Sequence, residues 1–155
     1  MGGSNGNALS SVEVTNIGNG PSCPGSNLPE AIYGHSATYS RNGIFVCGGR
    51  TNIRQKTNQC HRLGSNMQWI PFPALNIKRD GFTMDEVNGI LVAIGGLSGG
   101  QSLEYINLID DNEWTTKQLG FSIRRHCSVP ISEKEIMVIG GDLNDQVTLK
   151  KKLKL

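Results

Sequence analysis

Three pairs of glycine residues recur at nearly equal intervals along the chain, and each pair closes a short apolar run. The pairs are Gly48-Gly49, Gly95-Gly96 and Gly140-Gly141, so their first members stand 47 and 45 residues apart. Intervals of this length and regularity indicate copies of one supersecondary unit rather than a single hairpin. This feature constrains the fold more than any other in the sequence.

Each copy predicts a β-hairpin ahead of its glycine pair. A strand-like stretch precedes each apolar run, and a turn signal such as Arg41-Asn42-Gly43 or Val87-Asn88-Gly89 separates the two. A polar loop and a third strand candidate follow each pair. The predicted first strands are residues 36–40, 82–86 and 127–131, and the predicted third strands are residues 58–63, 103–108 and 146–149.

Tryptophan follows the third predicted strand in the first two copies. Trp69 and Trp114 stand 20 and 18 residues after the second glycine of their copies. A short strand around each would complete a four-stranded antiparallel unit. We expect the glycines where a buried strand ends and turns beside a neighbouring sheet, because a Cβ would clash there. We expect the tryptophans to pack across that gap and cover the glycine backbone.

This order of hairpin, glycine pair and tryptophan resembles the kelch repeat, whose four-stranded sheets form the blades of a β-propeller. The resemblance covers nearly the whole chain, and Ser102-Leu103-Glu104-Tyr105 is similar to Ser11-Val12-Glu13-Val14. It predicts an all-β fold, a partial β-propeller with two complete blades and two incomplete ones. The predicted units are residues 1–30 (the end of one blade), 35–74 and 81–119 (complete blades), 126–149 (the start of a blade) and 150–155 (a solvated basic tail).

Two complete blades cannot close a propeller, which needs about 4 to 8. A repeat unit buries its apolar face only against its neighbours. We therefore interpret the sequence as part of a longer chain that supplies the missing blades of the same propeller. We expect the isolated piece to be marginally stable or prone to self-association, because its end sheets are uncapped.

Composition excludes several classes of partner. Glycine accounts for 20 of 155 residues, charged residues make up only 18%, and the net charge is +2. A charge this small gives no reason to expect nucleic acid. No apolar run reaches the length of about 18 residues that predicts a membrane span.

Four cysteines, Cys23, Cys47, Cys60 and Cys127, are compatible with disulfides and equally with buried free thiols. Their positions resemble a subset of kelch proteins that are often extracellular, whereas other kelch proteins are cytoplasmic, so the compartment stays open. No Cys-x-x-Cys motif occurs, and we expect no metal or cofactor.

No motif places a nucleophile beside a base, so we expect no catalytic residues. The kelch architecture also occurs in a copper radical oxidase with tyrosine, histidine and cysteine ligands, which makes a copper-dependent oxidase the alternative from another functional class. The candidate ligands stand at different positions of the repeats; they are Tyr33, Tyr39, Tyr105, His35, His61 and His126.

The segments that cross from one blade to the next predict a binding surface, because they lie on one face of a propeller. Counting back 16 residues from Gly48, Gly95 and Gly140 reaches Ile32, Arg79 and Arg124. Arginines at an equivalent position suit an acidic peptide, since each guanidinium can hold a carboxylate by two hydrogen bonds. The alternative is a structural role in ion pairs with groups such as Asp80. The predicted partner-binding residues are Lys78, Arg79, Arg124, Arg125, His126, Tyr33 and His35.

The function predicted from sequence is thus a non-enzymatic module that presents interblade loops to a protein or acidic peptide. The resemblance also implies two narrower roles, substrate recognition in a cullin-RING ubiquitin ligase adaptor and actin binding. No BTB-like helical segment is present in the sequence to support either.

Overall fold

The computed structural model describes residues 3–18, 20–143, 146–147 and 150–154. These residues form strands, turns and loops and no helix, which confirms the predicted all-β class. Two four-stranded antiparallel sheets follow each other along the chain, and in each the strands lie side by side in sequence order. The first sheet contains β3 (Ser36–Ser40), β4 (Gly43–Cys47), β5 (Cys60–Leu63) and β6 (Trp69–Phe72), and the second contains β7 (Thr83–Val87), β8 (Ile90–Ile94), β9 (Ser102–Asn107) and β10 (Thr115–Gln118).

A third sheet is formed by β11 (Cys127–Ser132), β12 (Glu135–Ile139) and β15 (Lys150–Lys154). Two short antiparallel pairs complete the fold, β1 (Glu13–Val14) with β2 (Cys23–Pro24) and β13 (Asp142–Leu143) with β14 (Gln146–Val147).

The third strand of this last sheet differs from the prediction. Residues 146–147 turn back onto β13, residues 148–149 lie outside the described part of the chain, and the basic run 150–154 pairs with β12 along its full length. The predicted solvated tail is therefore a sheet strand. Each lysine has an ordinary backbone N–H and C=O, so a lysine-rich segment can pair with the open edge of β12.

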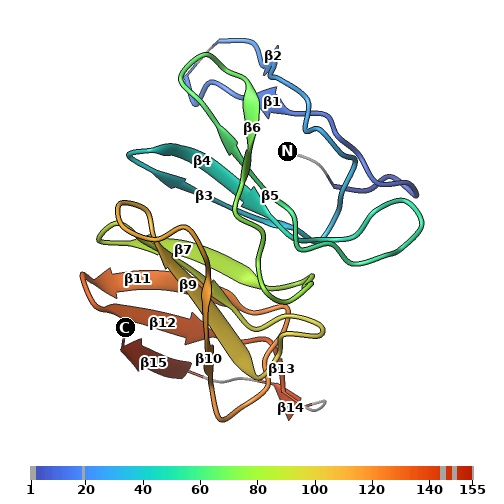
Figure 1. Cartoon of the computed structure of the whole chain (residues 1–155). Coiled ribbons are helices and arrows are strands. Elements are labelled where there is room, and N and C mark those ends of the chain that lie inside the picture. The colour runs from blue at the N-terminus through green and yellow to red at the C-terminus, as the bar shows by residue number, and fades with distance from the viewer. Residues whose placement is uncertain (1–2, 19, 144–145, 148–149, 155) are drawn as a thin grey trace.

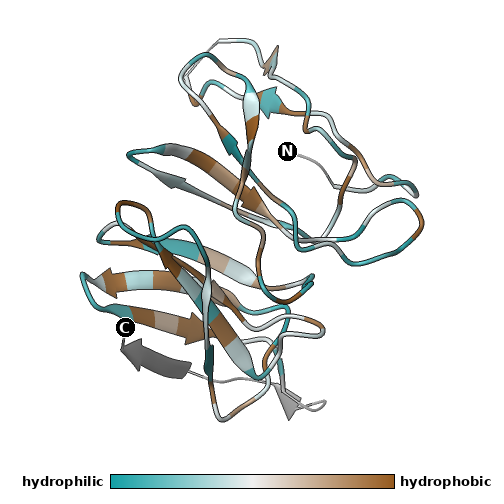
Figure 2. Ribbon diagram, viewed as in Figure 1, coloured by the Kyte–Doolittle hydropathy of each residue, from teal (hydrophilic) through white to brown (hydrophobic). Residues whose placement is uncertain are grey.

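The three sheets stand side by side, and the first strand of each faces the first strand of the next (Figure 1). β7 lies against both β3 and β11. The second strand of each sheet is rich in apolar residues, as the brown of β4 and β12 in Figure 2 shows for two of them. In β8 four successive residues, Leu91 to Ile94, are fully buried. A continuous apolar run of this kind is expected for a strand covered on both faces.

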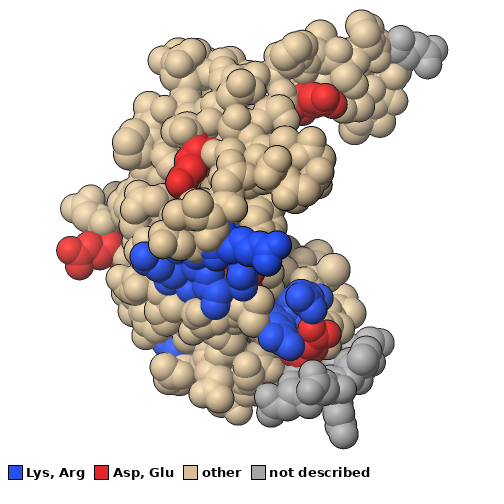
Figure 3. Space-filling model, turned by 90° about the vertical axis from the view of Figure 1, so that its right-hand side faces the viewer, with Lys and Arg blue, Asp and Glu red and all other residues tan. Residues whose placement is uncertain are grey.

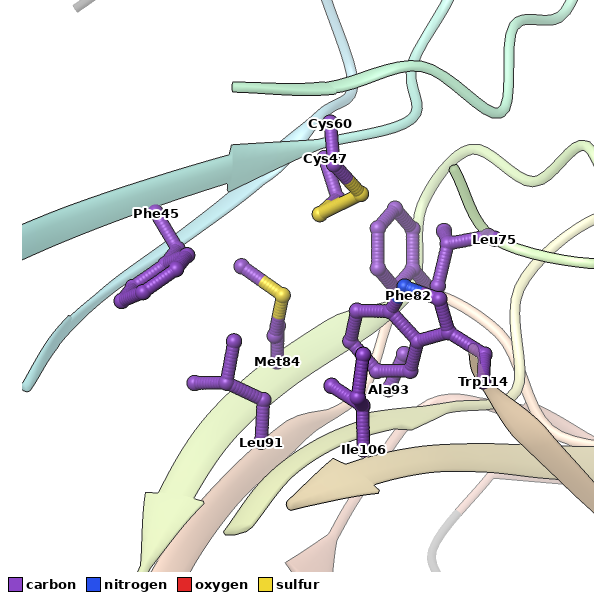
Figure 4. Packing of buried hydrophobic residues seen from close by; sticks show 10 residues of the cluster. All are labelled: Phe45, Cys47, Cys60, Leu75, Phe82, Met84, Leu91, Ala93, Ile106 and Trp114. Carbon is purple, nitrogen blue, oxygen red and sulfur yellow. A yellow bond between two sulfur atoms is a disulfide. The ribbon is translucent and has the colours of Figure 1, made fainter. Parts of the chain in front are cut away.

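The sheets are joined by apolar cores. The core between the first two contains Phe45, Met84, Leu91, Ile106 and Trp114 together with a disulfide that points toward Phe82 (Figure 4). A second core joins the second and third sheets; its buried members are Val87, Val92, Ile94, Leu103, Ile123, Ile136 and Val138.

The disulfide joins Cys47 and Cys60, which lie directly opposite each other on β4 and β5. Cys23 and Cys127 are exposed free thiols. The sequence is compatible with disulfides and with buried free thiols. One pair of cysteines forms a disulfide, and the other two are free thiols that are exposed rather than buried.

The glycine pairs lie where neighbouring backbones approach closely, as predicted, except that no atom of the described residues stands within 4 Å of a Cβ built on Gly140. A Cβ on Gly48 would stand 2.6 Å from the carbonyl oxygen of Arg79, and one on Gly95 would stand 2.3 Å from that of Ile123. Both glycines have positive φ, 63° and 65°. No larger residue fits either place without moving the next sheet.

That the tryptophans cover these glycines stays a prediction, but the structure shows what their indole N–H groups bind. Trp114 Nε1 donates a hydrogen bond to the carbonyl of Pro73, at the end of the first sheet, and Trp69 Nε1 donates to the carbonyl of Ser26; both distances are 2.8 Å. Each tryptophan therefore fastens its sheet to the preceding part of the chain.

Candidate binding face

One end of the three sheets is built from the crossing segments and from the loops that follow the glycine pairs. Each crossing forms a bridge with the residue directly after the second glycine: Tyr33 with Arg50, Asp80 with Leu97, and Arg124 with Asp142. The crossings also bond to each other, because Gly81 N–H donates to Gly34 and Arg125 N–H donates to Gly81. We call this end the glycine-end face.

These bridges correct the predicted equivalence of Arg79 and Arg124. Tyr33, Asp80 and Arg124 occupy corresponding places, whereas Arg79 corresponds to Ile123, because their carbonyls accept from Gly49 and Gly96 respectively. The reason is a bulge in the third hairpin. Pro130 pairs with Ile136 and Ser132 with Glu135, so Ile131 is an extra residue, and counting back from Gly140 falls one place short.

Arg79 is not available to a partner, so its prediction as a binding residue is wrong. Its side chain is fully buried and its Nη2 lies 2.5 Å from Glu104 Oε1, whose side chain is also fully buried. Arg79 Nη1 donates to the carbonyl of Gly95 at 2.7 Å, and Nη2 donates to Ser102 Oγ at 3.2 Å. Burial lowers the pKa of Arg79, while Glu104 opposes that shift. Arg79 belongs to the architecture of the second sheet.

Glu104 extends this buried network to the crossing that leads into the second sheet. Its carboxylate accepts the backbone N–H groups of Asn76 at 2.5 Å and Ile77 at 3.2 Å. Gly99 makes room for the guanidinium, because a Cβ there would stand 2.6 Å from Arg79 Cζ.

His126 is also buried, so its predicted role as a partner contact is wrong. Its Nε2 lies 2.8 Å from Thr83 Oγ1 on β7, the first strand of the neighbouring sheet. Burial lowers the pKa of His126 to about 4, because the charged imidazolium would lose its hydration. The ring is therefore neutral at physiological pH and joins the second and third sheets.

The protein should lose about 2 kcal/mol of unfolding free energy through His126 as the pH falls from 7 to 5. The pKa of His126 is about 4 in the folded chain and about 6.5 in the unfolded chain. As the pH decreases, the unfolded chain therefore takes up the proton at a higher pH than the folded chain does, and the free energy of unfolding decreases. His126→Phe copies Phe82, because each ring lies against the first glycine of the preceding pair, Phe82 against Gly48 and His126 against Gly95. Urea unfolding at both pH values should show a smaller pH effect in this variant.

Burial also lowers the pKa of His61, which is half-buried, so a smaller dependence of the same sign should remain in the variant. An unchanged pH effect in His126→Phe would contradict the assignment.

The remaining predicted residues differ in exposure. Lys78 and Arg125 are exposed, and Tyr33, His35 and Arg124 are half-buried.

The structure adds cations that sequence reasoning missed. Arg50 Nε pairs with Asp80 Oδ2 at 2.6 Å, and Lys56 Nζ donates to Ser98 Oγ. The available signal was position, since Arg50 directly follows a glycine pair. Lysine and arginine side chains gather across the middle of this face (Figure 3).

A groove of about 530 Å³ lies between the second and third sheets at this end. At its edge Arg124 Nε and Arg125 Nη1 both approach Asp142 Oδ2, at 3.4 and 3.3 Å. The groove is lined by Gly96, Leu97, Ser98, Gly100, Gln101, Ser122, Arg124 and Asp142.

Among the described residues, no three His, Cys, Asp or Glu side chains are grouped so that they could hold a metal ion. The same part of the chain contains no helix that is long and apolar enough to span a membrane.

No protein-family model matches the chain. Human Kelch-like protein 34 is 27% identical over 132 residues, a match that covers 75% of this chain and 20% of that protein. The solved structure of YjhT matches with a TM-score of 0.77 and 11% identity, over 94% of this chain and 49% of the YjhT chain. The chain thus spans about one fifth of the length of the human relative and half that of YjhT. The likeness to YjhT shows the fold alone.

Proposed function

Because the chain consists of kelch repeats that form part of a β-propeller, we propose that it is a non-enzymatic module that binds an acidic protein or peptide through its glycine-end face. The observation that carries this proposal is the gathering of basic side chains on one face (Figure 3). They come from the first post-glycine loop and from the two crossings that follow it. The loops that carry them are held by a rigid sheet scaffold, which is how propellers and other β folds commonly present binding residues.

The charges on this face favour an anionic partner. Asp80 and Asp142 each face an arginine of the same face, so they do not form a separate acidic patch. Lys56 and Lys78 extend the basic surface along the first post-glycine loop and the next crossing. Electrostatic complementarity of this kind speeds association and selects the partner.

The narrower roles in a ubiquitin ligase adaptor or in actin binding stay predictions, because the shared repeats make up one fifth of Kelch-like protein 34. A copper-dependent oxidase would carry stoichiometric copper when purified, so metal analysis separates that alternative from a binding module.

The binding proposal is tested by fluorescence anisotropy with a labelled octapeptide of alternating glutamate and glycine. The double variant Lys56→Glu/Lys78→Glu should bind it at least about tenfold more weakly. The matched control is Arg41→Glu/Lys134→Glu, which reverses two charges in hairpin turns at the other end of the strands. Equal losses in both double variants would show that only net charge matters, and binding unaffected by either would contradict the proposal.

A further inference from the structure

The two junctions between sheets at the glycine-end face are closed differently. At the first junction, Arg50 of the first sheet pairs with Asp80 of the next crossing, and Lys56 bonds to Ser98. At the second junction, the bridges put Leu97 in the place of Arg50 and Arg124 in the place of Asp80. Leucine cannot pair with arginine. The groove of about 530 Å³ remains open at this junction, with Arg124 at its edge.

Arg124 and Arg125 converge instead on a single carboxylate oxygen of their own sheet, Asp142 Oδ2. The distances of 3.4 and 3.3 Å exceed those of good charge-assisted hydrogen bonds, and the three side chains are 37%, 68% and 35% exposed. Exposed ion pairs of this kind contribute little to stability. Asp142 therefore shows that the two guanidinium groups can face one carboxylate together while it holds them only weakly.

The backbone of Arg125 gives an independent indication of function. Its φ is +53°, and the corresponding residues in the two preceding crossings are glycines, Gly34 at +64° and Gly81 at +61°. This left-handed conformation disfavours every residue with a Cβ. An arginine is present where glycine would be more stable, and its side chain is mostly exposed. Strain without a structural gain is typical of functional positions.

We propose that Arg124 and Arg125 form a carboxylate-binding subsite at the edge of this groove, and that Asp142 occupies the subsite until an acidic side chain of a peptide partner displaces it. This inference rests on the proposed function and locates one contact within it. Two guanidinium groups around one carboxylate give both charge and directional hydrogen bonds. The lining glycines and serines leave space for the peptide backbone beside the subsite.

The test measures stability and binding in the same variants. Arg125→Gly restores the residue type of Gly34 and Gly81, so its Tm should rise by about 2 to 4 °C. Its affinity for an acetylated, amidated Gly-Glu-Gly-Glu-Gly peptide should nevertheless fall about tenfold. Asp142→Asn removes the internal competitor and should tighten binding of the same peptide about threefold or more.

Peptide controls identify the carboxylate. The glutamine counterpart of the amidated peptide should bind poorly to every variant, and the same glutamine peptide with a free C-terminus tests whether a terminal carboxylate can substitute. If Arg125→Gly binds the glutamate peptide as tightly as the original chain, or if Asp142→Asn weakens binding, the subsite is wrong. If the subsite is wrong but Lys56→Glu/Lys78→Glu still weakens peptide binding, the proposed function stands. If none of these substitutions changes peptide binding, the proposed function is wrong as well.

Discussion

Replacing Arg79 by isoleucine should lower the free energy of unfolding by about 3 to 5 kcal/mol. The substitution leaves the Glu104 carboxylate fully buried without its cation, and burying an unpaired charge is costly. It also leaves the carbonyl of Gly95 without the guanidinium donor. Isoleucine suits the local shape, since Ile123 occupies the corresponding place in the third sheet. Urea unfolding followed by circular dichroism measures the loss.

The double variant Arg79→Ile/Glu104→Gln separates charge from packing. Glutamine keeps an acceptor for the backbone N–H of Asn76 and carries no charge. We expect the double variant to regain more than half of the stability lost in Arg79→Ile, because removing both charges of a buried pair costs less than removing one. Additive losses in the two single variants and the double variant would show that Arg79 and Glu104 do not interact as described.

The sheets were predictable from sequence because the signals are local. Hairpin turns such as Asn88-Gly89 and the apolar runs before the glycine pairs specify each strand within a few residues. The third hairpin shows the limit of this reasoning. The bulge at Ile131 adds one residue to the third hairpin, and the distance between glycine pairs does not reveal it. The predicted correspondence of Arg124 is therefore wrong by one residue. Bulges depend on how the strand meets its neighbours, which a single sequence does not state.

The binding face was predictable in its position and less so in its residues. Arg79, Arg124 and Arg125 are alike in sequence, yet Arg79 is buried because Glu104, 25 residues further on, and Gly99 enclose it. His126 is buried because Thr83 lies across the junction between two sheets. The sequence predicts only polar connections after the glycine pairs and therefore does not single out Arg50 or Asp142. Burial and pairing across sheets are tertiary properties, and residue type alone does not determine them.

Trp114→Ala should cost about 3 to 5 kcal/mol of unfolding free energy. The side chain is 4% exposed and lies among the core residues of Figure 4. Its ring lies edge-on to Phe72 at 6.4 Å, and its N–H bonds to the carbonyl of Pro73. Alanine would leave a cavity in the core between the first and second sheets. Urea unfolding of the variant, followed by circular dichroism, measures the cost.

Two controls divide this effect into its parts. Trp114→Phe keeps a ring and removes the hydrogen bond to Pro73, so it should cost only about 1 to 2 kcal/mol. In a Trp69→Phe background, Trp114 is the sole tryptophan, and its fluorescence should be blue-shifted in the folded state as expected for a buried indole. Fluorescence emission typical of a solvent-exposed indole, or an alanine variant as stable as the original chain, would contradict this packing.

Because Trp114 connects the second sheet to the end of the first, we also expect its removal to weaken their coupling. Two separate unfolding transitions in Trp114→Ala would locate the cooperativity of the chain in this junction.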